Sequence, residues 1–543
     1  MSRWLIFPAW FLAIAATAAF WWWQGRPIAV PDAPSKIIPC VSFAPHRGSQ
    51  SAMDPELIIP AAQIEEDLKL LSHHTRCVRT YGVGQGLDRV PEIAERFGIK
   101  VMLGAWLSPN DADNARQMEV ALDLANRFPE TVTALIVGNE VLLRGDLPEH
   151  KLVEHLRKAR ESVLMPVTYA DVTDFWFRHR SLADDVDFVT IHILPYWDDD
   201  PVGVDETMAR ARTLWKEARE VFPNTPLFVG EAGWPSAGRM RGEALPSRVN
   251  QAQFVRELLE LAKSENMDLN LIEAFDQPWK RVNEGTVGGY WGLFSESREE
   301  KWPLTGPVSN DPSWHVHLAW SVAIAAIPMA LVLAFRRRIS STGWLFLCLT
   351  SHAAACALVL AMLNVSQTSI DTADWVVGLA RWSLAVVAFA LTVTASVVSR
   401  ASSPNTLTMM PALNLLEALK SGKFASLRGL APALGLVWIL TLFGAAVATL
   451  GLVFDARYRD FPVLVYLVPT IAFAVLVLCR RQNREADLRE ESLLAWILAA
   501  GGIAIVLLEG FVNHQAMAWA AVNFVLAGTV AYQKHSCRRA RPL

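Results

Sequence analysis

Short apolar runs alternate with amphipathic stretches between residues 27 and 314 of the chain. Such runs, bounded by polar residues, predict buried strands, and the amphipathic stretches between them have the apolar spacing of helices. The predicted strands are 37–44, 77–82, 100–106, 133–139, 165–171, 186–196, 226–231 and 270–276. Strands that alternate with helices over about 280 residues predict the α/β class and a (β/α)₈ TIM barrel. A doubly wound open sheet is the alternative, but no glycine-rich phosphate turn follows the first strand.

Much longer apolar segments flank this region on both sides. Residues 4–23 are about one bilayer-spanning helix long and end without a small-residue cleavage site, which predicts an uncleaved N-terminal transmembrane anchor over 1–26. A proline-rich linker, 27–36, leads into the predicted barrel domain, 37–314. Beyond it, further apolar segments predict a polytopic α-helical region of seven transmembrane helices over 315–543. They are 317–335, 341–363, 375–399, 430–454, 461–479, 492–510 and 516–533.

Basic residues fall on alternate connections between these segments. The positive-inside rule then predicts eight spans in a bacterial cytoplasmic membrane, with both termini cytoplasmic and the barrel on the periplasmic side. Arg381 lies inside the predicted span 375–399, so this span either starts later or turns Arg381 toward protein. The basic residues concerned are Arg336, Arg337, Arg338, Lys420, Lys423, Arg428, Arg480, Arg481, Arg484, Arg538, Arg539 and Arg541.

The composition supports the lipid bilayer as a partner and argues against nucleic acid. Hydrophobic residues make up 52% of the chain and charged residues 19%, and the net charge is −4. Neither CxxC nor Cys/His zinc spacing occurs among the 6 cysteines, so the sequence indicates no metal site and no cofactor. Cys40 and Cys77 fall on adjacent predicted strands in an oxidising compartment. Whether they form a disulfide stays open at this point, because the geometry of the pair cannot be read from sequence.

The carboxyl ends of the predicted strands carry a specific set of polar and aromatic residues. In a barrel of this kind the active site is built at these ends. Glu140 follows strand four and Glu231 ends strand seven, on roughly opposite sides of the barrel mouth. Two carboxylates in this arrangement suit glycoside chemistry, in which one protonates the leaving oxygen and the other attacks the anomeric carbon. Aromatic residues around the same rim suit the apolar faces of pyranose rings.

Each of these residues also has a simpler interpretation. A lone glutamate at a strand end is commonly an ion-pair partner, but Asn139 beside Glu140 and the Gly233–Pro235 turn beside Glu231 favour a site. Tyr196 and Trp234 have packing aromatics as their alternative. His192 lies inside a strand and is interpreted as a core or supporting residue. The acidic run 198–200 is interpreted as a solvated loop, because the predicted topology places it outside the cell, away from nucleotide sugars.

Two motifs carry a resemblance to a known family. "VGNEV" at 137–141 and "LFVGEAGWPSAGR" at 227–239 resemble the acid/base and nucleophile motifs of glycoside hydrolase family 17, the β-1,3-glucanase group. The resemblance covers about 37–310 and implies a retaining barrel, with Glu140 as general acid/base and Glu231 as nucleophile. "EAFDQPWK" at 273–280 resembles the strand-eight segment, where the family often has an acidic residue followed by lysine. Here Gln277 holds the acidic position and Lys280 the basic one.

Motif resemblance and rim position together define the candidate substrate-binding residues. "VRTYG" and "LPYW" resemble family strands that contact substrate, which carries over to Arg79, Tyr81 and Tyr196. The full candidate set is Asn139, Arg79, Tyr81, Tyr196, Trp197, Trp234, Asp276, Trp279 and Lys280.

The arrangement of anchor, barrel and polytopic region resembles membrane-bound bacterial proteins labelled β-(1,6)-glucan synthases. The leading hypothesis is a membrane-anchored enzyme that transfers or hydrolyses β-1,3-glucan, with a separate glucan synthase as a further candidate partner. The alternative is a non-catalytic glucan-binding or export component. Binding alone does not require both carboxylates, which favours the enzyme. A processive polymerase is disfavoured, because Gly378 breaks the near-match "GLARW" to a Gln-x-x-Arg-Trp motif.

Overall fold

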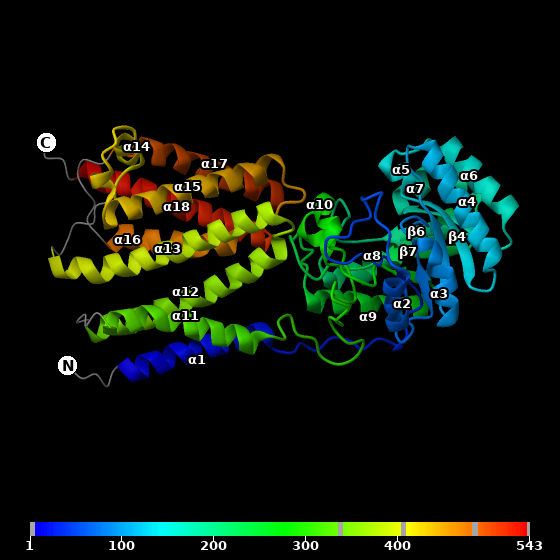
Figure 1. The fold of residues 1–543 in the computed structure, drawn as a ribbon, viewed down its shortest axis with the longest axis horizontal. Helices are drawn as coiled ribbons and strands as arrows, with labels where there is room; N and C mark the ends of the chain where they lie inside the picture. Colours follow the sequence, from blue (N-terminus) through cyan, green and yellow to red (C-terminus); the bar gives the residue numbers. More distant parts are fainter. Residues whose placement is uncertain (1–5, 335–339, 403–408, 480–486, 540–543) are drawn as a thin grey trace. The chain divides into compact units, whose positions relative to one another are not determined.

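The computed structural model describes residues 6–334, 340–402, 409–479 and 487–539 (Figure 1). The chain divides into two compact units. One is Pro27–Ser309, and the other combines Met1–Arg26 with Asn310–Leu543. The first unit contains the predicted linker and most of the predicted barrel domain, and the second combines the predicted anchor with the predicted helical region.

The first unit is a closed barrel of parallel strands that follow one another in sequence order from β1 to β8. Each predicted strand has an observed counterpart, which confirms the barrel. Strand β8 is Asp268–Leu271, so most of the predicted run 270–276 lies in the loop after the strand. The other strands are β1 (Val41–Ser42), β2 (Cys77–Arg79), β3 (Lys100–Ala105), β4 (Val132–Asn139), β5 (Val167–Val172), β6 (Val189–Ile193) and β7 (Leu227–Ala232).

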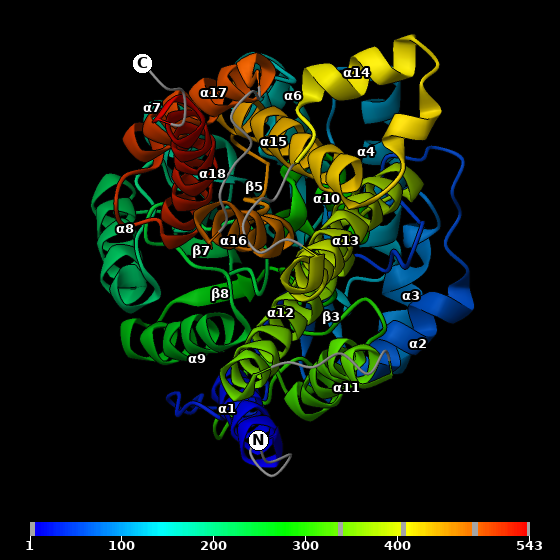
Figure 2. The ribbon, with the colours of Figure 1, turned by 90° about the vertical axis from the view of Figure 1, so that its left-hand side faces the viewer.

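Amphipathic helices cover the outside of the barrel, and Figure 2 shows several of them around the strands. Helix α4 (Asp111–Arg127) illustrates how the sequence forms them. The Asn110 side chain accepts hydrogen bonds from the first-turn amides of Ala112 and Asp113, and residues such as Met118 and Leu124 are buried. The other helices of this outer layer include α2 (Ala61–Leu71), α3 (Val90–Arg96), α6 (Glu149–Ser162), α8 (Thr207–Val221) and α9 (Arg248–Glu265).

A disulfide joins Cys40, just before β1, to Cys77, the first residue of β2. The bonded pair packs against buried apolar residues of the neighbouring strands, among them Met102 and Ile136. Because Cys77 begins its strand, the bond lies at the amino end of the barrel, away from the strand ends where barrel enzymes place their sites. Its role is therefore stability.

Removing this disulfide is expected to destabilise the barrel. The cross-link spans a sequence separation of 37, and closing a loop of this length stabilises a fold by about 2–4 kcal/mol. The Cys40→Ala/Cys77→Ala variant should therefore unfold several degrees below the wild type, measured by tryptophan fluorescence on the full chain in detergent. Cys348→Ala/Cys356→Ala, which removes two buried free thiols, is the matched control. Equal unfolding temperatures for wild type and the disulfide variant would contradict the expectation.

The second unit is a set of mostly apolar helices, in the region where the sequence predicts seven transmembrane helices. By length and composition alone, and among the described residues, six of them could cross a membrane: α11 (Trp314–Ala334), α12 (Ser341–Thr368), α13 (Thr372–Ser402), α15 (Leu430–Phe454), α17 (Arg489–Glu509) and α18 (His514–Arg539). Helix α16 (Val463–Cys479) has a shorter apolar part, Val463–Leu478. Helix α14 (Ala412–Lys420) is short. The orientation in a bilayer stays a prediction.

Helix α1 (Ile6–Gly25), at the position of the predicted anchor, packs into this helical unit. The Trp21 indole donates a hydrogen bond to Ser321 Oγ of α11 at 2.9 Å. Thr17 Oγ1 lies 2.9 Å from His352 Nδ1 of α12. Arg381, which interrupted a predicted span, lies within α13, is half-buried, and interacts with Tyr466 of α16. It therefore faces protein.

Candidate active site

Glu140 stands directly after β4, where the chain turns sharply into the barrel mouth. Its φ of 53° is in the left-handed region, and Gly138 two residues earlier has φ 83°. A Cβ at position 138 would lie 2.6 Å from Val141 Cγ2, so only glycine fits there. The Glu140 amide donates to Ala170 O at 2.7 Å. The side chain is 24% exposed, which leaves its carboxylate accessible to a substrate.

Glu231, near the end of β7, is 5% exposed and is held by Arg79 of β2. Arg79 Nη1 donates to Glu231 Oε1 at 3.1 Å and to Gly230 O at 2.6 Å. Its Nη2 donates to Asn139 Oδ1 at 2.6 Å. Arg79 is completely buried, so in this structure it orients Glu231 and Asn139 and does not reach the mouth itself.

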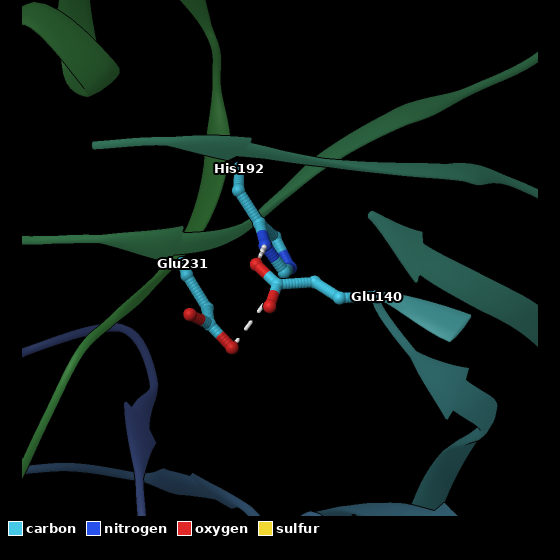
Figure 3. Close-up of side chains that lie close together, drawn as sticks. All are labelled: Glu140, His192 and Glu231. Carbon is cyan, nitrogen blue, oxygen red and sulfur yellow. Dashed lines mark hydrogen bonds and ion pairs between the residues drawn. The ribbon is translucent and has the colours of Figure 1, made fainter. Parts of the chain in front are cut away.

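His192 of β6 lies beside the Glu140 carboxylate and near that of Glu231, as Figure 3 shows. Its Nδ1 is 3.0 Å from Glu140 Oε1, and its Nε2 is 3.9 Å from Glu231 Oε1. One donor atom from each of the three side chains lies within 4.8 Å of the others. This placement fits the interpretation of His192 as a core or supporting residue. Its contact with Glu140 and its pairing with Glu231 in the parallel register come from the closure of the barrel.

The charges around the site favour an ionised Glu231. Burial alone raises the pKa of Glu231, but the positive charges of His192, Arg79 and Lys280 outweigh it and hold the pKa below its ordinary value. Burial likewise lowers the pKa of His192, yet the carboxylates of Glu231 and Glu140 raise it above its ordinary value overall. At neutral pH Glu231 is therefore ionised.

The loop after β8 adds a buried ion pair that the sequence did not predict. Lys280 Nζ lies 3.1 and 3.0 Å from the two carboxylate oxygens of Glu273. Burial raises the pKa of Glu273 to about 7, against the lowering effect of Lys280. Gln277 instead donates to Ala44 O and accepts a hydrogen bond from Trp279 Nε1. Glu273 thus takes the role of acidic partner to Lys280 that the motif assigns to position 277.

Asp276 is enclosed by the loops that follow β7 and β8. Its Oδ1 accepts hydrogen bonds from Lys301 Nζ at 2.8 Å and from the Gly292 amide at 2.9 Å. Lys301 also donates to Ser236 Oγ at 2.8 Å. Both charged groups are buried, so Asp276 fastens these loops in the structure. Its candidate contact with substrate stays untested.

The candidate aromatics divide by exposure. Tyr196 and Trp234 are completely buried; the Tyr196 hydroxyl donates to Arg239 O, and the Trp234 indole donates to Leu245 O. The packing interpretation fits these two residues. Tyr81, Trp197 and Trp279 are half-buried and remain candidates for sugar contact.

Trp106, which follows β3, is a rim aromatic that the sequence analysis missed. It is 38% exposed, and the Arg144 guanidinium lies 4.2 Å from its ring centroid. Its position just beyond a strand end is the sequence feature that could have identified it as a rim residue.

Glu140, His192 and Glu231 also form, within the described part of the chain, the group of side chains whose donors lie close enough together to hold a metal ion. The guanidinium of Arg79 already places a positive charge 3.1 Å from Glu231 Oε1. A cation at the same oxygen would be repelled. The geometry suits glycoside chemistry, in which two carboxylates act on one bond.

Comparison with known proteins shows what the barrel is similar to. Residues 40–292, somewhat less than half of the chain, match the family model of the BtgE/BtgC glycoside hydrolase domain. This similarity agrees with the glycoside hydrolase or transglycosylase class that the sequence predicted.

Individual relatives are similar over the same region. The glucan 1,3-beta-glucosidase BGL2 of Candida albicans is 26% identical over 268 residues, which cover 44% of this chain and 85% of that protein. The glucan endo-1,3-beta-glucosidase btgC of Emericella nidulans is 26% identical over 283 residues, 46% of this chain and 41% of that protein. The glycoside hydrolase family 17 beta-1,3-glucanosyltransferase of Rhizomucor miehei is 23% identical, with coverage of 50% and 97% and a TM-score of 0.44.

Proposed function

We propose that the protein is a membrane-anchored, retaining enzyme that acts on β-1,3-glucan by glucanosyl transfer, hydrolysis or both. The observation that carries the proposal is the pair of carboxylates at the ends of β4 and β7, with donor atoms within 4.8 Å of each other. Retaining glycosidases hold their carboxyl groups about 5–5.5 Å apart, whereas inverting ones hold them about 6.5–9.5 Å apart. The short separation favours the retaining mechanism.

In the first step Glu231 attacks the anomeric carbon of the bound sugar. The bond from that carbon to the glycosidic oxygen breaks, and Glu140 gives its proton to the leaving oxygen. Arg79 supports this step by holding the carboxylate of Glu231 in place through Oε1. The product is a glycosyl ester on Glu231, with Glu140 ionised.

In the second step a hydroxyl group attacks the same carbon and releases Glu231. Glu140 now acts as a base and takes the proton of the attacking hydroxyl. Water as the attacking group gives hydrolysis, and a sugar hydroxyl gives transfer, either elongating the chain or branching it through a β-1,6 linkage. The half-buried rings of Trp197 and Trp279 are surfaces on which an acceptor sugar could stack.

The apolar helices support a position in the bacterial cytoplasmic membrane. The alternation of basic clusters along the sequence favours cytoplasmic termini and a barrel on the periplasmic side. The Cys40–Cys77 disulfide agrees with that side, because disulfides persist in oxidising compartments. Access to newly made glucan there would bring the barrel close to a separate glucan synthase.

The second candidate is a non-catalytic glucan-binding or export component. Tyr196 and Trp234 are buried, so fewer of the aromatic residues in the family-like motifs are exposed for binding glucan. The paired, oriented carboxylates of Glu140 and Glu231 favour the enzyme.

Product analysis with the full chain in detergent tests the proposal. A β-1,3-linked glucose pentamer is incubated with the protein, and its products are separated by size and analysed for linkage. Shorter products alone indicate hydrolysis, longer β-1,3 products indicate elongation, and new β-1,6 bonds indicate branching. The Glu231→Gln protein, purified in the same way, controls for contaminating glucanases. No product from the wild type, together with retained binding of the pentamer, would overturn the enzyme and favour the binding component.

A further inference from the structure

His192 is a buried titratable group at the site to which the two-carboxylate reaction assigns no role. Its side chain is 0% exposed, and its Nε2 is among the buried polar atoms of the described residues without a hydrogen-bond partner. A buried polar atom without a partner costs stability. Within the described residues, the ring is hydrogen-bonded to Glu140 through Nδ1 at 3.0 Å, while Glu231 Oε1 lies 3.9 Å from Nε2, beyond hydrogen-bond distance. This cost calls for an explanation in the function of the site.

Charged groups from four elements face the His192 ring. Glu140 follows β4, Asp171 lies on β5, Glu231 lies on β7, and Arg79 lies on β2. The two glutamates outweigh burial and Arg79 and raise the pKa of His192. The ring therefore keeps a proton to a higher pH than an ordinary histidine, directly beside the group proposed as acid and base.

We propose that Glu140 and His192 hold one proton between them, and that His192 is a positioning residue that orients Glu140 and supplies this proton to it. The inference rests on the proposed function and deepens it. In the resting site the proton lies on Nδ1 of His192 or on Oε1 of Glu140, 3.0 Å apart. From Glu140 it passes to the leaving oxygen.

The charge of the site supports this assignment. Before the reaction the Glu140–His192 pair carries one proton and no net charge, and Glu231 carries one negative charge. After the first step the pair has lost its proton and carries one negative charge, while Glu231 is a neutral ester. The second step returns the proton from the attacking hydroxyl to the pair and the charge to Glu231. The total charge of Glu140, His192 and Glu231 therefore stays constant through both steps. The buried guanidinium of Arg79 keeps a counter-charge throughout.

The shared proton has a consequence for the dependence of rate on pH. Cleavage of a natural glucan requires the proton, so the rate falls on the alkaline side when the pair loses it. With His192 present, that loss follows the raised pKa of the imidazole. Without His192 only a carboxyl group is left, and carboxyl groups ordinarily lose their proton at lower pH than histidine. The alkaline limb should then move to lower pH.

The test compares His192→Asn and His192→Leu with the wild type as full chains, using kcat/KM for a β-1,3-linked glucose pentamer from pH 4 to pH 9. Asparagine can keep a donor near the position of Nδ1 but cannot titrate, and leucine removes both properties. For His192→Asn we expect the alkaline limb to move by about one pH unit or more toward acid. For His192→Leu we expect in addition a fall of about 10–100-fold at the optimum, the usual loss for a hydrogen bond to a charged group.

Asp171→Asn is the matched control, because burial raises the pKa of Asp171 to about 6. Without this control, deprotonation of Asp171 could account for the fall in rate on the alkaline side. An alkaline limb that is unchanged in His192→Asn, or that moves equally in Asp171→Asn, overturns the inference and leaves the proposed function intact. Unfolding temperatures separate a folding defect from a changed limb; if His192→Leu does not fold, His192→Asn decides. A wild type without activity overturns the proposed function and this inference with it.

Discussion

Glu231→Gln is expected to abolish hydrolysis and transfer together. In the proposed mechanism both reactions pass through the same glycosyl ester on Glu231, and glutamine cannot form it. We expect kcat/KM to fall by about 10⁴-fold or more, on β-1,3-oligosaccharides and on aryl β-glucosides alike. An activated leaving group cannot help, because the missing group is the nucleophile. Initial rates on both substrates, measured with the full chain in detergent, give the result.

The substitution should leave the fold intact, which makes the result interpretable. A glutamine Oε1 can still accept the hydrogen bond that Arg79 Nη1 donates at 3.1 Å, and Arg79 keeps its contacts with Gly230 O and Asn139 Oδ1. An unchanged unfolding temperature and retained binding of the oligosaccharide are the controls. Activity within 100-fold of the wild type in a folded Glu231→Gln protein would mean that another group is the nucleophile.

The barrel could be predicted from sequence because its strands are short, apolar and separated by amphipathic helices. The eighth strand shows the limit of this signal. The predicted run 270–276 continues into the loop, since Glu273, Ala274 and Phe275 are buried there as completely as strand residues. Burial, not strand pairing, makes a run apolar, so a buried loop extends the pattern.

The positions of Glu140 and Glu231 at the barrel mouth could be predicted because one rule, the position of sites at the carboxyl ends of strands, places both of them. The contacts of the residues around them could not be predicted. Lys301 meets Asp276 from 25 positions away, and His192 meets Glu140 from 52 positions away. These contacts depend on closure and register of the barrel. Neither contact produces a characteristic short spacing between residues in the sequence.

The motif residues show a second limit. Tyr196 and Trp234 belong to segments that resemble family motifs, yet both are buried and hold neighbouring loops through Arg239 O and Leu245 O. In a single sequence, a residue that packs around a site cannot be distinguished from a residue that binds the substrate. Likewise, the prediction that Cys40 and Cys77 lie on adjacent strands left their disulfide open. The structure settles it by placing the Cα atoms of the two cysteines 4.4 Å apart.

Glu140→Gln is expected to separate the two halves of the reaction. Loss of a general acid slows cleavage of a natural glucan by about 10²–10⁴-fold. An aryl β-glucoside with a good leaving group needs no proton, so it should still transfer its sugar to Glu231 at close to the wild-type rate. The second step then lacks its base. The ester should accumulate and appear as a burst of released phenol, followed by slow turnover.

The same variant distinguishes the role of Glu140 from that of the other buried glutamate near the site. Glu273→Gln is the matched control, because Glu273 is bonded to Lys280 and has no assigned step. It should affect natural and activated substrates to the same degree and give no burst. Azide, a small nucleophile that needs no base, should restore turnover of the aryl glycoside in Glu140→Gln alone. If the aryl glycoside fails as severely as the natural glucan in Glu140→Gln, Glu140 is not the general acid, and the shared proton with His192 loses its acceptor.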